Sequence, residues 1–150
     1  GRYVSQSDDQ NNSGAITGWN SSPKPGGSWS DTTKTGNDPC PSGYRVPTSS
    51  QWQAVINNNN VERVGSFSNN MNYTSALYIK NPSGERTLML PAAGFRMESG
   101  GSLIRRGSNG YYWSSSWMST GSADLRLDSS SLIASASGNA YGFSVRCVVE

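Results

Sequence analysis

Residues 38–52 read DPCPSGYRVPTSSQW, and this stretch decides how the rest of the chain is arranged. Its Pro- and Gly-containing start predicts a turn, which a short extended segment at 44–46 follows. Thr48 is a good helix N-cap, and Gln51 stands three residues later, as a capping box requires. Apolar residues then share one helical face at i, i+3 and i+4 spacing, namely Trp52, Val55 and Ile56. We therefore predict one clear helix, which the asparagine run at 57–60 ends.

Beyond the helix the chain predicts antiparallel strands. Residues 76–79 and 86–90 flank Asn-Pro-Ser-Gly at 81–84, whose turn chemistry predicts a hairpin. Residues 111–116 predict a further strand. The last strand is expected at 141–149, with one face made of alternate residues: Phe143, Val145, Cys147 and Val149.

The segment 123–128 alternates between apolar and charged residues. A half-buried strand with this pattern places Leu125 and Leu127 inward. The charged residues between them are expected to point outward, namely Asp124, Arg126 and Asp128. Together with the single helix, these strands predict an α+β fold with a loop-rich antiparallel sheet.

The composition of the chain excludes several classes of function. At 150 residues and 16.1 kDa, the span 1–150 fits a single domain. Its 33% hydrophobic content holds no run long enough for a membrane span and argues against a helical bundle. A net charge of +2 with scattered arginines does not predict a nucleic-acid surface. The sequence contains no His, which removes Ser-His-Asp and Cys-His catalysis and imidazole metal ligands, so we expect a binding or structural domain without a cofactor.

The first 39 residues carry almost no hydrophobic periodicity. Residues 5–14 are polar and predict a loop, and the Pro-, Gly- and Ser-rich stretch that follows contains Trp19 and Trp29. We expect each indole to fold back over the core as a plug. The Ser-rich segment 129–137 is expected to form an ordered turn, with the Leu-Ile pair at 132–133 as its buried tip.

The two cysteines, Cys40 and Cys147, lie near opposite ends of the chain. A disulfide between them would close a loop of about 108 residues and contribute roughly 4–5 kcal/mol in the chain-entropy model. The alternative is two buried free thiols. The disulfide predicts an oxidising, extracellular compartment. Because the chain starts at Gly1 without a signal peptide, we expect it to be the C-terminal domain of a longer exported protein.

Several short motifs suggest other chemistry. Ser-x-x-Lys at 21–24 and Lys-Thr-Gly at 34–36 match elements of penicillin-binding enzymes, but a Pro interrupts the first and the two lie too close together, so we interpret both as coincidence. Turn residues could instead supply oxygen ligands to calcium, namely Asp31, Asn37 and Asp38. Asn and Asp more often form turns, and we predict no metal. Three asparagines begin glycosylation sequons: Asn11, Asn20 and Asn72.

Four blocks carry a resemblance to a known family. They are DPCPSGYRVPT at 38–48 with Trp52, LPAAGFR at 90–96, YWSSS at 112–116 and SVRCV at 144–148. In this order and spacing they resemble the Fibrobacter succinogenes major paralogous domain, a family of exported bacterial surface modules. The resemblance implies a C-type-lectin-like fold, in the version shared with formylglycine-generating enzymes. It does not extend to that enzymatic activity, because the two cysteines occupy the family's structural positions.

A second resemblance covers the block from YWSSS to GFSVRC at 142–147. It is similar to the variable region of proteins that are mutated by diversity-generating retroelements, some of which are pilus-tip adhesins. Such elements randomise adenines, so that Asn codons become codons for Ser, Gly, Asp, Tyr, Thr, Ala or Arg, among others. Residues of these types fill the outward positions between Trp113 and Gly142, whereas Trp117 and Met118 do not arise in this way.

We therefore expect a non-catalytic extracellular adhesin or receptor domain at a bacterial cell surface or pilus tip. Its partners would be a glycan or protein ligand and subunits of the surface assembly, without nucleic acid or membrane insertion. Trp113 is expected to pack in the core, and Arg105 and Arg106 to be exposed. The expected ligand-binding residues are Tyr111, Trp117, Met118, Ser119, Thr120, Asp124, Arg126, Asp128, Ser130, Asn139 and Tyr141. The alternative is a structural module without its own ligand.

Overall fold

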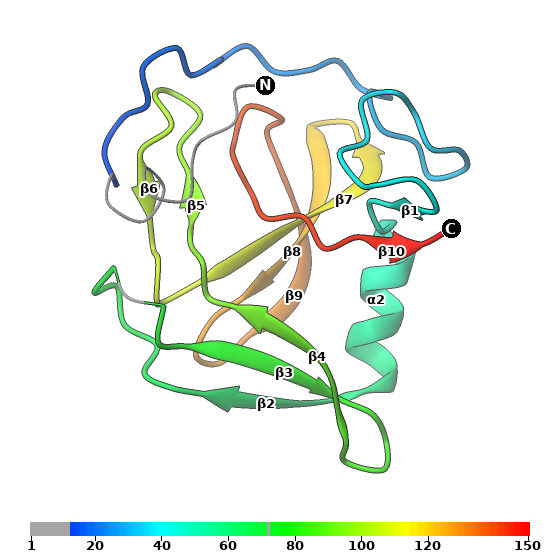
Figure 1. Cartoon of the computed structure of the whole chain (residues 1–150), viewed down its shortest axis with the longest axis vertical. Helices are drawn as coiled ribbons and strands as arrows, with labels where there is room; N and C mark the ends of the chain where they lie inside the picture. The colour runs from blue at the N-terminus through cyan, green and yellow to red at the C-terminus, as the bar shows by residue number, and fades with distance from the viewer. Residues whose placement is uncertain (1–12, 72) are drawn as a thin grey trace.

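The computed structural model describes residues 13–71 and 73–150, in which one helix lies at the side of several antiparallel strands (Figure 1). One three-stranded sheet has the order β2 (Asn60–Val64), β3 (Ala76–Lys80) and β4 (Arg86–Pro91). A second has the order β7 (Gly110–Met118), β8 (Gly121–Leu127) and β9 (Leu132–Ser137). Two short pairs join β1 (Tyr44–Arg45) to β10 (Val148–Val149) and β5 (Phe95–Arg96) to β6 (Leu103–Ile104). The predicted α+β class is confirmed.

The helix α2 (Ser49–Asn58) begins as the sequence predicts. The Thr48 hydroxyl accepts a hydrogen bond from the Gln51 N–H at 3.1 Å, and the Gln51 side chain accepts one from the Thr48 N–H at 2.8 Å. On the inner face Trp52 is buried, and its indole N–H donates to the Trp113 carbonyl of β7 at 3.1 Å. The capping box therefore fixes the helix start, and the indole fastens the helix to the second sheet.

The main core lies where α2 meets both large sheets. Its buried members are apolar and come from α2, β3, β4, β7, β8 and the residue that follows β4, namely Trp52, Leu77, Ile79, Leu90, Ala92, Tyr112, Leu125 and Leu127. Leu125 and Leu127 point inward, as their alternation predicts. Burial raises the pKa of the Tyr112 phenol, whose hydroxyl donates to the Pro91 carbonyl at 2.7 Å.

The hairpin of β3 and β4 forms around the predicted turn, and β2 adds an edge strand that the sequence did not reveal. On β2 the side chains are half-buried or exposed, and Val61 is one of the exposed apolar residues. Glu62 pairs with Arg86 of β4 and Lys80 of β3 across the sheet. Without a strict apolar alternation, such an edge strand has little sequence signature.

The opposite face of β7 and β8 is also covered, which corrects the prediction that Asp124 points outward. Asp124 is 1% exposed, and Trp113, its cross-strand partner on this face, stacks on Phe143 with ring centroids 4.3 Å apart. The Arg126 Nε donates to Asp124 Oδ1 at 2.8 Å and so neutralises the buried charge. Alternation of charged and apolar residues indicates two faces, but not that one of them meets water.

The C-terminal segment forms less strand than predicted. Only Val148–Val149 pairs as β10, while Gly142 and Ser144 make isolated bridges to Arg96 and Tyr112. The expectation of a turn at 129–137 is also wrong, because β9 occupies most of it and Ile133 is 51% exposed. As an edge strand of small residues, β9 needs no strongly apolar inner face.

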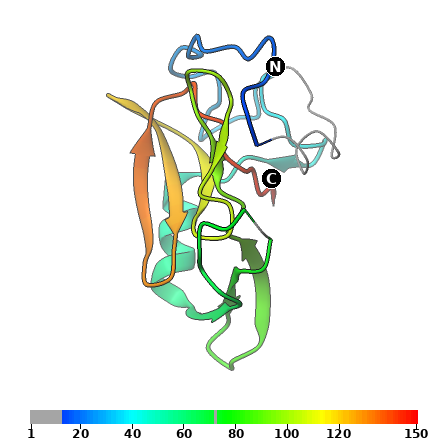
Figure 2. The same cartoon turned by 90° about the vertical axis from the view of Figure 1, so that its left-hand side faces the viewer.

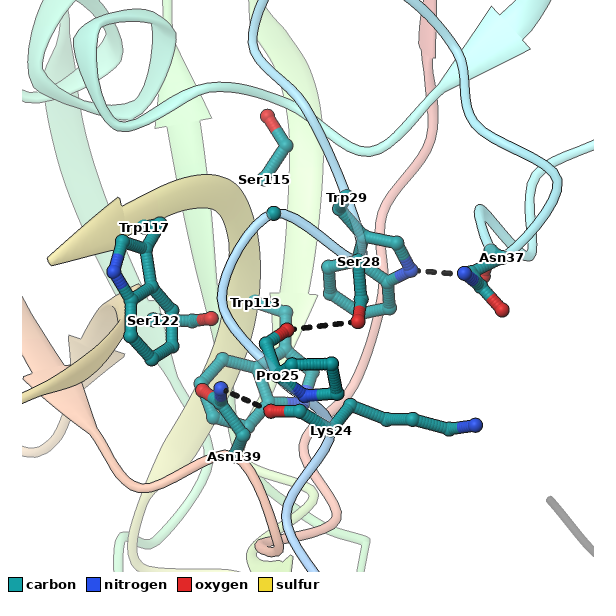
Figure 3. A pocket seen from close by; sticks show the side chains of 11 residues that line it. Lys24, Pro25, Ser28, Trp29, Asn37, Trp113, Ser115, Trp117, Ser122 and Asn139 are labelled. Carbon is teal, nitrogen blue, oxygen red and sulfur yellow. Dashed lines mark hydrogen bonds between the residues drawn. The ribbon is translucent and has the colours of Figure 1, made fainter.

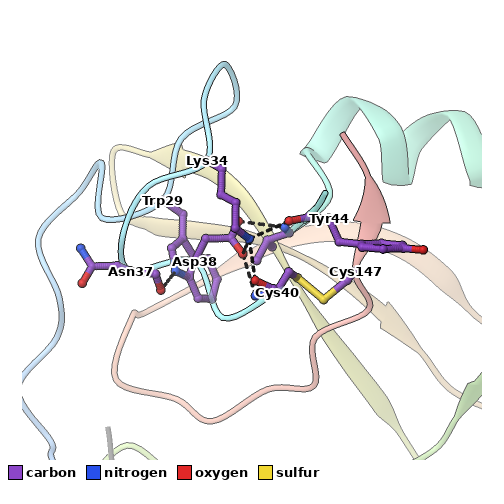
Figure 4. Close-up of a disulfide and its surroundings, with 8 residues drawn as sticks. Trp29, Lys34, Asn37, Asp38, Cys40, Tyr44 and Cys147 are labelled. Carbon is purple, nitrogen blue, oxygen red and sulfur yellow. Dashed lines mark hydrogen bonds and ion pairs between the residues drawn. A yellow bond between two sulfur atoms is a disulfide. The ribbon is translucent and has the colours of Figure 1, made fainter. Parts of the chain in front are cut away.

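A disulfide joins Cys40 to Cys147, with their Cα atoms 5.8 Å apart, as the sequence predicts. It lies beside the pairing of β1 with β10 and ties the start of the folded core to its end (Figure 4). This bond is compatible with an oxidising extracellular location. Within the described part of the chain, no helix is long and apolar enough to cross a membrane.

The irregular N-terminal segment runs along one end of the molecule, above the ends of β5, β6 and β7 in Figure 1. Trp19 packs as the predicted plug. Its indole N–H donates to the Glu98 carbonyl at 3.1 Å, and a Cβ added to Gly101 or Gly142 would lie within 2.8 Å of the ring. Most of the predicted loop at 5–14 lies outside the described residues, as do the sequons at Asn11 and Asn72.

Candidate functional site

The N-terminal segment is fastened to β7 by one carboxylate. Asp31 accepts hydrogen bonds from the hydroxyls of Ser115 at 2.6 Å and Ser116 at 2.7 Å. The Ser116 hydroxyl in turn accepts from the Ser49 N–H at the start of α2. This chain of hydrogen bonds holds the loop around Asp31 against the tip of the second sheet.

Asp38 fixes the same segment near the disulfide (Figure 4). Its carboxylate accepts from the N–H groups of Cys40 and Val46 and pairs with Lys34, whose ammonium also donates to the carbonyls of Cys40 and Tyr44. Burial alone would raise the pKa of Asp38, but these hydrogen bonds outweigh it and hold the pKa below its ordinary value. Asp31 and Asp38 thus serve as hydrogen-bond acceptors for protein groups. In the described residues, no three His, Cys, Asp or Glu side chains gather as a metal site.

A pocket of about 290 Å³ lies between this loop and the tip of the β7–β8 hairpin (Figure 3). The loop supplies one wall with Lys24, Pro25, Gly27, Ser28, Trp29 and Asn37. The second sheet and the segment after it supply the other wall with Trp113, Ser115, Trp117, Ser122 and Asn139. The hairpin tip projects beyond the rest of the sheet at the upper left of Figure 2.

Three indoles give the pocket its apolar surface. Trp113 is 6% exposed and is held by its stacking on Phe143. Trp29 is half-buried, and its N–H donates to the Asn37 carbonyl at 2.8 Å. Trp117 is 49% exposed, yet it packs against the loop so closely that a Cβ on Gly26 would lie 2.4 Å from its ring. The rings of Trp113 and Trp29 are therefore fixed, while the half-exposed ring of Trp117 borders the open side of the pocket.

Polar groups on the sheet side of the pocket are small. Asn139 donates through Nδ2 to the Lys24 carbonyl at 2.9 Å, which joins the segment after β9 to the N-terminal loop. Its carboxamide oxygen is buried and has no hydrogen-bond partner in the described structure. Ser122 lies directly across the hairpin from Trp117. These groups offer one hydroxyl and one unsatisfied acceptor.

The structure brings part of the predicted binding set together. Trp117 and Asn139 both line the pocket. Beside them at the hairpin tip, Met118 is 48% exposed, and Ser119 and Thr120 are exposed in the turn. The strand β7 continues through Met118, so the Trp-Met pair lies at a strand end rather than in a loop.

Other predicted residues lie away from the pocket. Asp128 follows the far end of β8, where hydrogen bonds from the N–H groups of Ser130 and Ser131 lower its carboxyl pKa. Ser130 is exposed in that same turn. Tyr141 is half-buried, with its ring 5.8 Å from Phe143. These residues shape separate parts of the surface.

Three residues for which ligand binding or exposure was predicted are buried. Tyr111 is 6% exposed, because Phe95 packs edge-on against its ring at 4.5 Å and Arg105 donates to its hydroxyl. Asp124 is buried as described above. Arg106 is also 6% exposed, since its guanidinium donates to the Met71 carbonyl and lies over the Tyr73 ring at 4.6 Å.

Arg126 is partly exposed, but its guanidinium already makes hydrogen bonds within the protein. Besides Asp124, its guanidinium bonds the Ala136 carbonyl and the Ser137 hydroxyl, each at 2.9 Å, and it lies near the Tyr111 ring. It cross-links β8 to β9 and is not a free cation for a ligand.

The loop wall of the pocket was absent from the predicted set. Trp29 was predicted only as a plug, and Trp113 only as a core residue, which its burial confirms. A Trp inside a Pro-, Gly- and Ser-rich loop was the available indication that the loop has an apolar contact. It could not reveal that the contact lies at the β7–β8 tip. No family model, curated protein or solved structure matches the chain.

Proposed function

We propose that the chain is a non-catalytic extracellular ligand-binding domain of the adhesin or receptor type, with a C-type-lectin-like fold. The observation that carries the proposal is the pocket of about 290 Å³ with indoles on both walls, next to an exposed Trp-Met pair. Concave sites with aromatic walls and a few convergent polar groups are typical of ligand binding. The disulfide and the sequence resemblance support placement at a bacterial surface or pilus tip.

The hairpin tip is suited to variation between related sequences. Ser119 and Thr120 are exposed in a turn, so substitutions there cost little stability. The framework beneath them is fixed by Trp113 and the disulfide at Cys147. This arrangement supports a display surface diversified by a retroelement. Codons for 103–147 sequenced across a source population would then show clustered changes at adenines, and a uniform sequence would contradict diversification.

Binding of the folded domain to arrays of glycans and of surface proteins tests the proposed function. We expect saturable binding to members of one array, which weakens when Trp117 is replaced by Ala while the melting temperature is kept. Binding to neither array would contradict the proposal and favour a structural module.

A further inference from the structure

The shape of the pocket walls favours a flat, rigid ligand. Trp113 and Trp29 are fixed by the Phe143 stack and the Asn37 carbonyl, so their faces do not reorganise around a flexible chain. The ring of Trp117 forms a third wall of the pocket and packs against the backbone of Gly26. At about 290 Å³ the space lies at the small end of ligand pockets, which accommodates one ring rather than several.

The polar groups of the pocket favour a ligand that donates hydrogen bonds. The buried Asn139 carboxamide oxygen has no donor in the described structure. A buried acceptor without a donor costs free energy, and a ligand hydroxyl that reaches it from the pocket side would remove that cost. Ser122, opposite Trp117, can donate to or accept from a second hydroxyl.

Charge favours a neutral ligand. Lys24 is the one charged residue among the described residues that line the pocket, and its side chain extends away from Trp113 and Trp117 in Figure 3. Since none of these lining residues carries a carboxylate, the pocket also lacks the ligand set on which calcium sites depend. A bridging cation is therefore not part of recognition.

We infer that the pocket binds one neutral pyranose ring of a glycan, without calcium. A pyranose has a flat face of C–H bonds, which stacks on an indole, and a rim of hydroxyls, which meets Asn139 and Ser122. This inference rests on the proposed ligand-binding function and adds the ligand class and its location. The rest of the glycan would leave the pocket past the exposed edge of Trp117.

An array of neutral and acidic oligosaccharides, read with and without EDTA, tests the inference together with three variants. Trp117→Ala removes one stacking wall and is expected to lower affinity about tenfold, and Trp117→Phe to restore part of it. Met89→Ala is the matched control, because Met89 on β4 is also an exposed apolar residue and does not line the pocket. It is expected to change affinity less than about twofold. Both side chains are about half exposed, so all three variants should fold, and circular dichroism checks this.

Neutral glycans retained in EDTA, weakened with Trp117→Ala and kept with Met89→Ala would support the inference. Calcium-dependent binding, binding of acidic glycans alone, or equal losses with the Met89 and Trp117 variants would overturn it. Binding that appears only on a protein array would overturn the ligand class while leaving the proposed function standing. Binding to neither array would overturn both.

Discussion

The two faces of β7 and β8 are both covered below the hairpin tip, but by different chemistry. Toward α2, Leu125 and Leu127 are at most 1% exposed in an aliphatic core. On the other face, aromatic rings and the Asp124–Arg126 pair are held by stacking and directed hydrogen bonds. The first face stabilises the fold through apolar burial. The second fixes side chains in defined positions, and through Trp113 it extends into the pocket.

Truncation of the aliphatic face should have the largest effect on stability. Leu125→Ala leaves a cavity in the packed core and is expected to lower the free energy of unfolding by about 3–5 kcal/mol. Ile133→Ala is the control, since Ile133 is 51% exposed on the neighbouring β9. Urea unfolding followed by tryptophan fluorescence measures both. Equal losses for the two variants would contradict the placement of the core.

Removal of the disulfide should have the second-largest effect on the free energy of unfolding. The double variant Cys40→Ser/Cys147→Ser is expected to lose about 2–4 kcal/mol, because the unfolded chain regains the freedom of a long loop. Urea unfolding of oxidised and reduced wild type gives the same comparison without substitution. A reduced protein as stable as the oxidised one would contradict the role of this bond.

The polar face should contribute to stability through the ion pair of Asp124 with Arg126. Asp124→Ala removes a carboxylate that is 1% exposed and leaves the Arg126 guanidinium without its partner. Because Arg126 is about one third exposed, we expect a loss of about 2 kcal/mol, below the range for a fully buried pair. A loss below about 0.5 kcal/mol would mean that Asp124 behaves as the solvated residue that simple alternation predicts.

The contrast between the two faces also explains which features could be predicted from the sequence and which could not. The helix with its capping box, the hairpin at 76–90, the disulfide and the inward leucines follow from local patterns, and all are confirmed. The burial of Asp124 occurs on a face where Phe143 stacks on Trp113, and that stack is a tertiary contact between distant residues. The pocket depends on the Asp31–Ser115 and Lys24–Asn139 hydrogen bonds, which join residues far apart in the chain.

Strong acid should weaken the contacts that hold the N-terminal segment at Asp38. Because the folded pKa of Asp38 lies below its ordinary value of 3.8, its carboxylate stabilises the fold above that pH. The contribution is lost as the pH falls through the lower, folded pKa. Asp38→Asn should lower stability at neutral pH by about 1–2 kcal/mol and flatten the pH dependence of stability below about pH 4. Urea unfolding across that range measures it, and an unchanged acid slope would contradict the assignment.

The five indole N–H signals in a ¹⁵N–¹H spectrum test the central claim most directly. Trp29, Trp113 and Trp117 line the pocket, while Trp19 donates to the Glu98 carbonyl and serves as the internal control. The probe is a set of methyl glycosides of neutral hexoses. We expect saturable shifts of the three pocket signals with at least one glycoside, and none at Trp19. A shift confined to Trp19, or no shift with any glycoside, would contradict binding of a neutral sugar in this pocket.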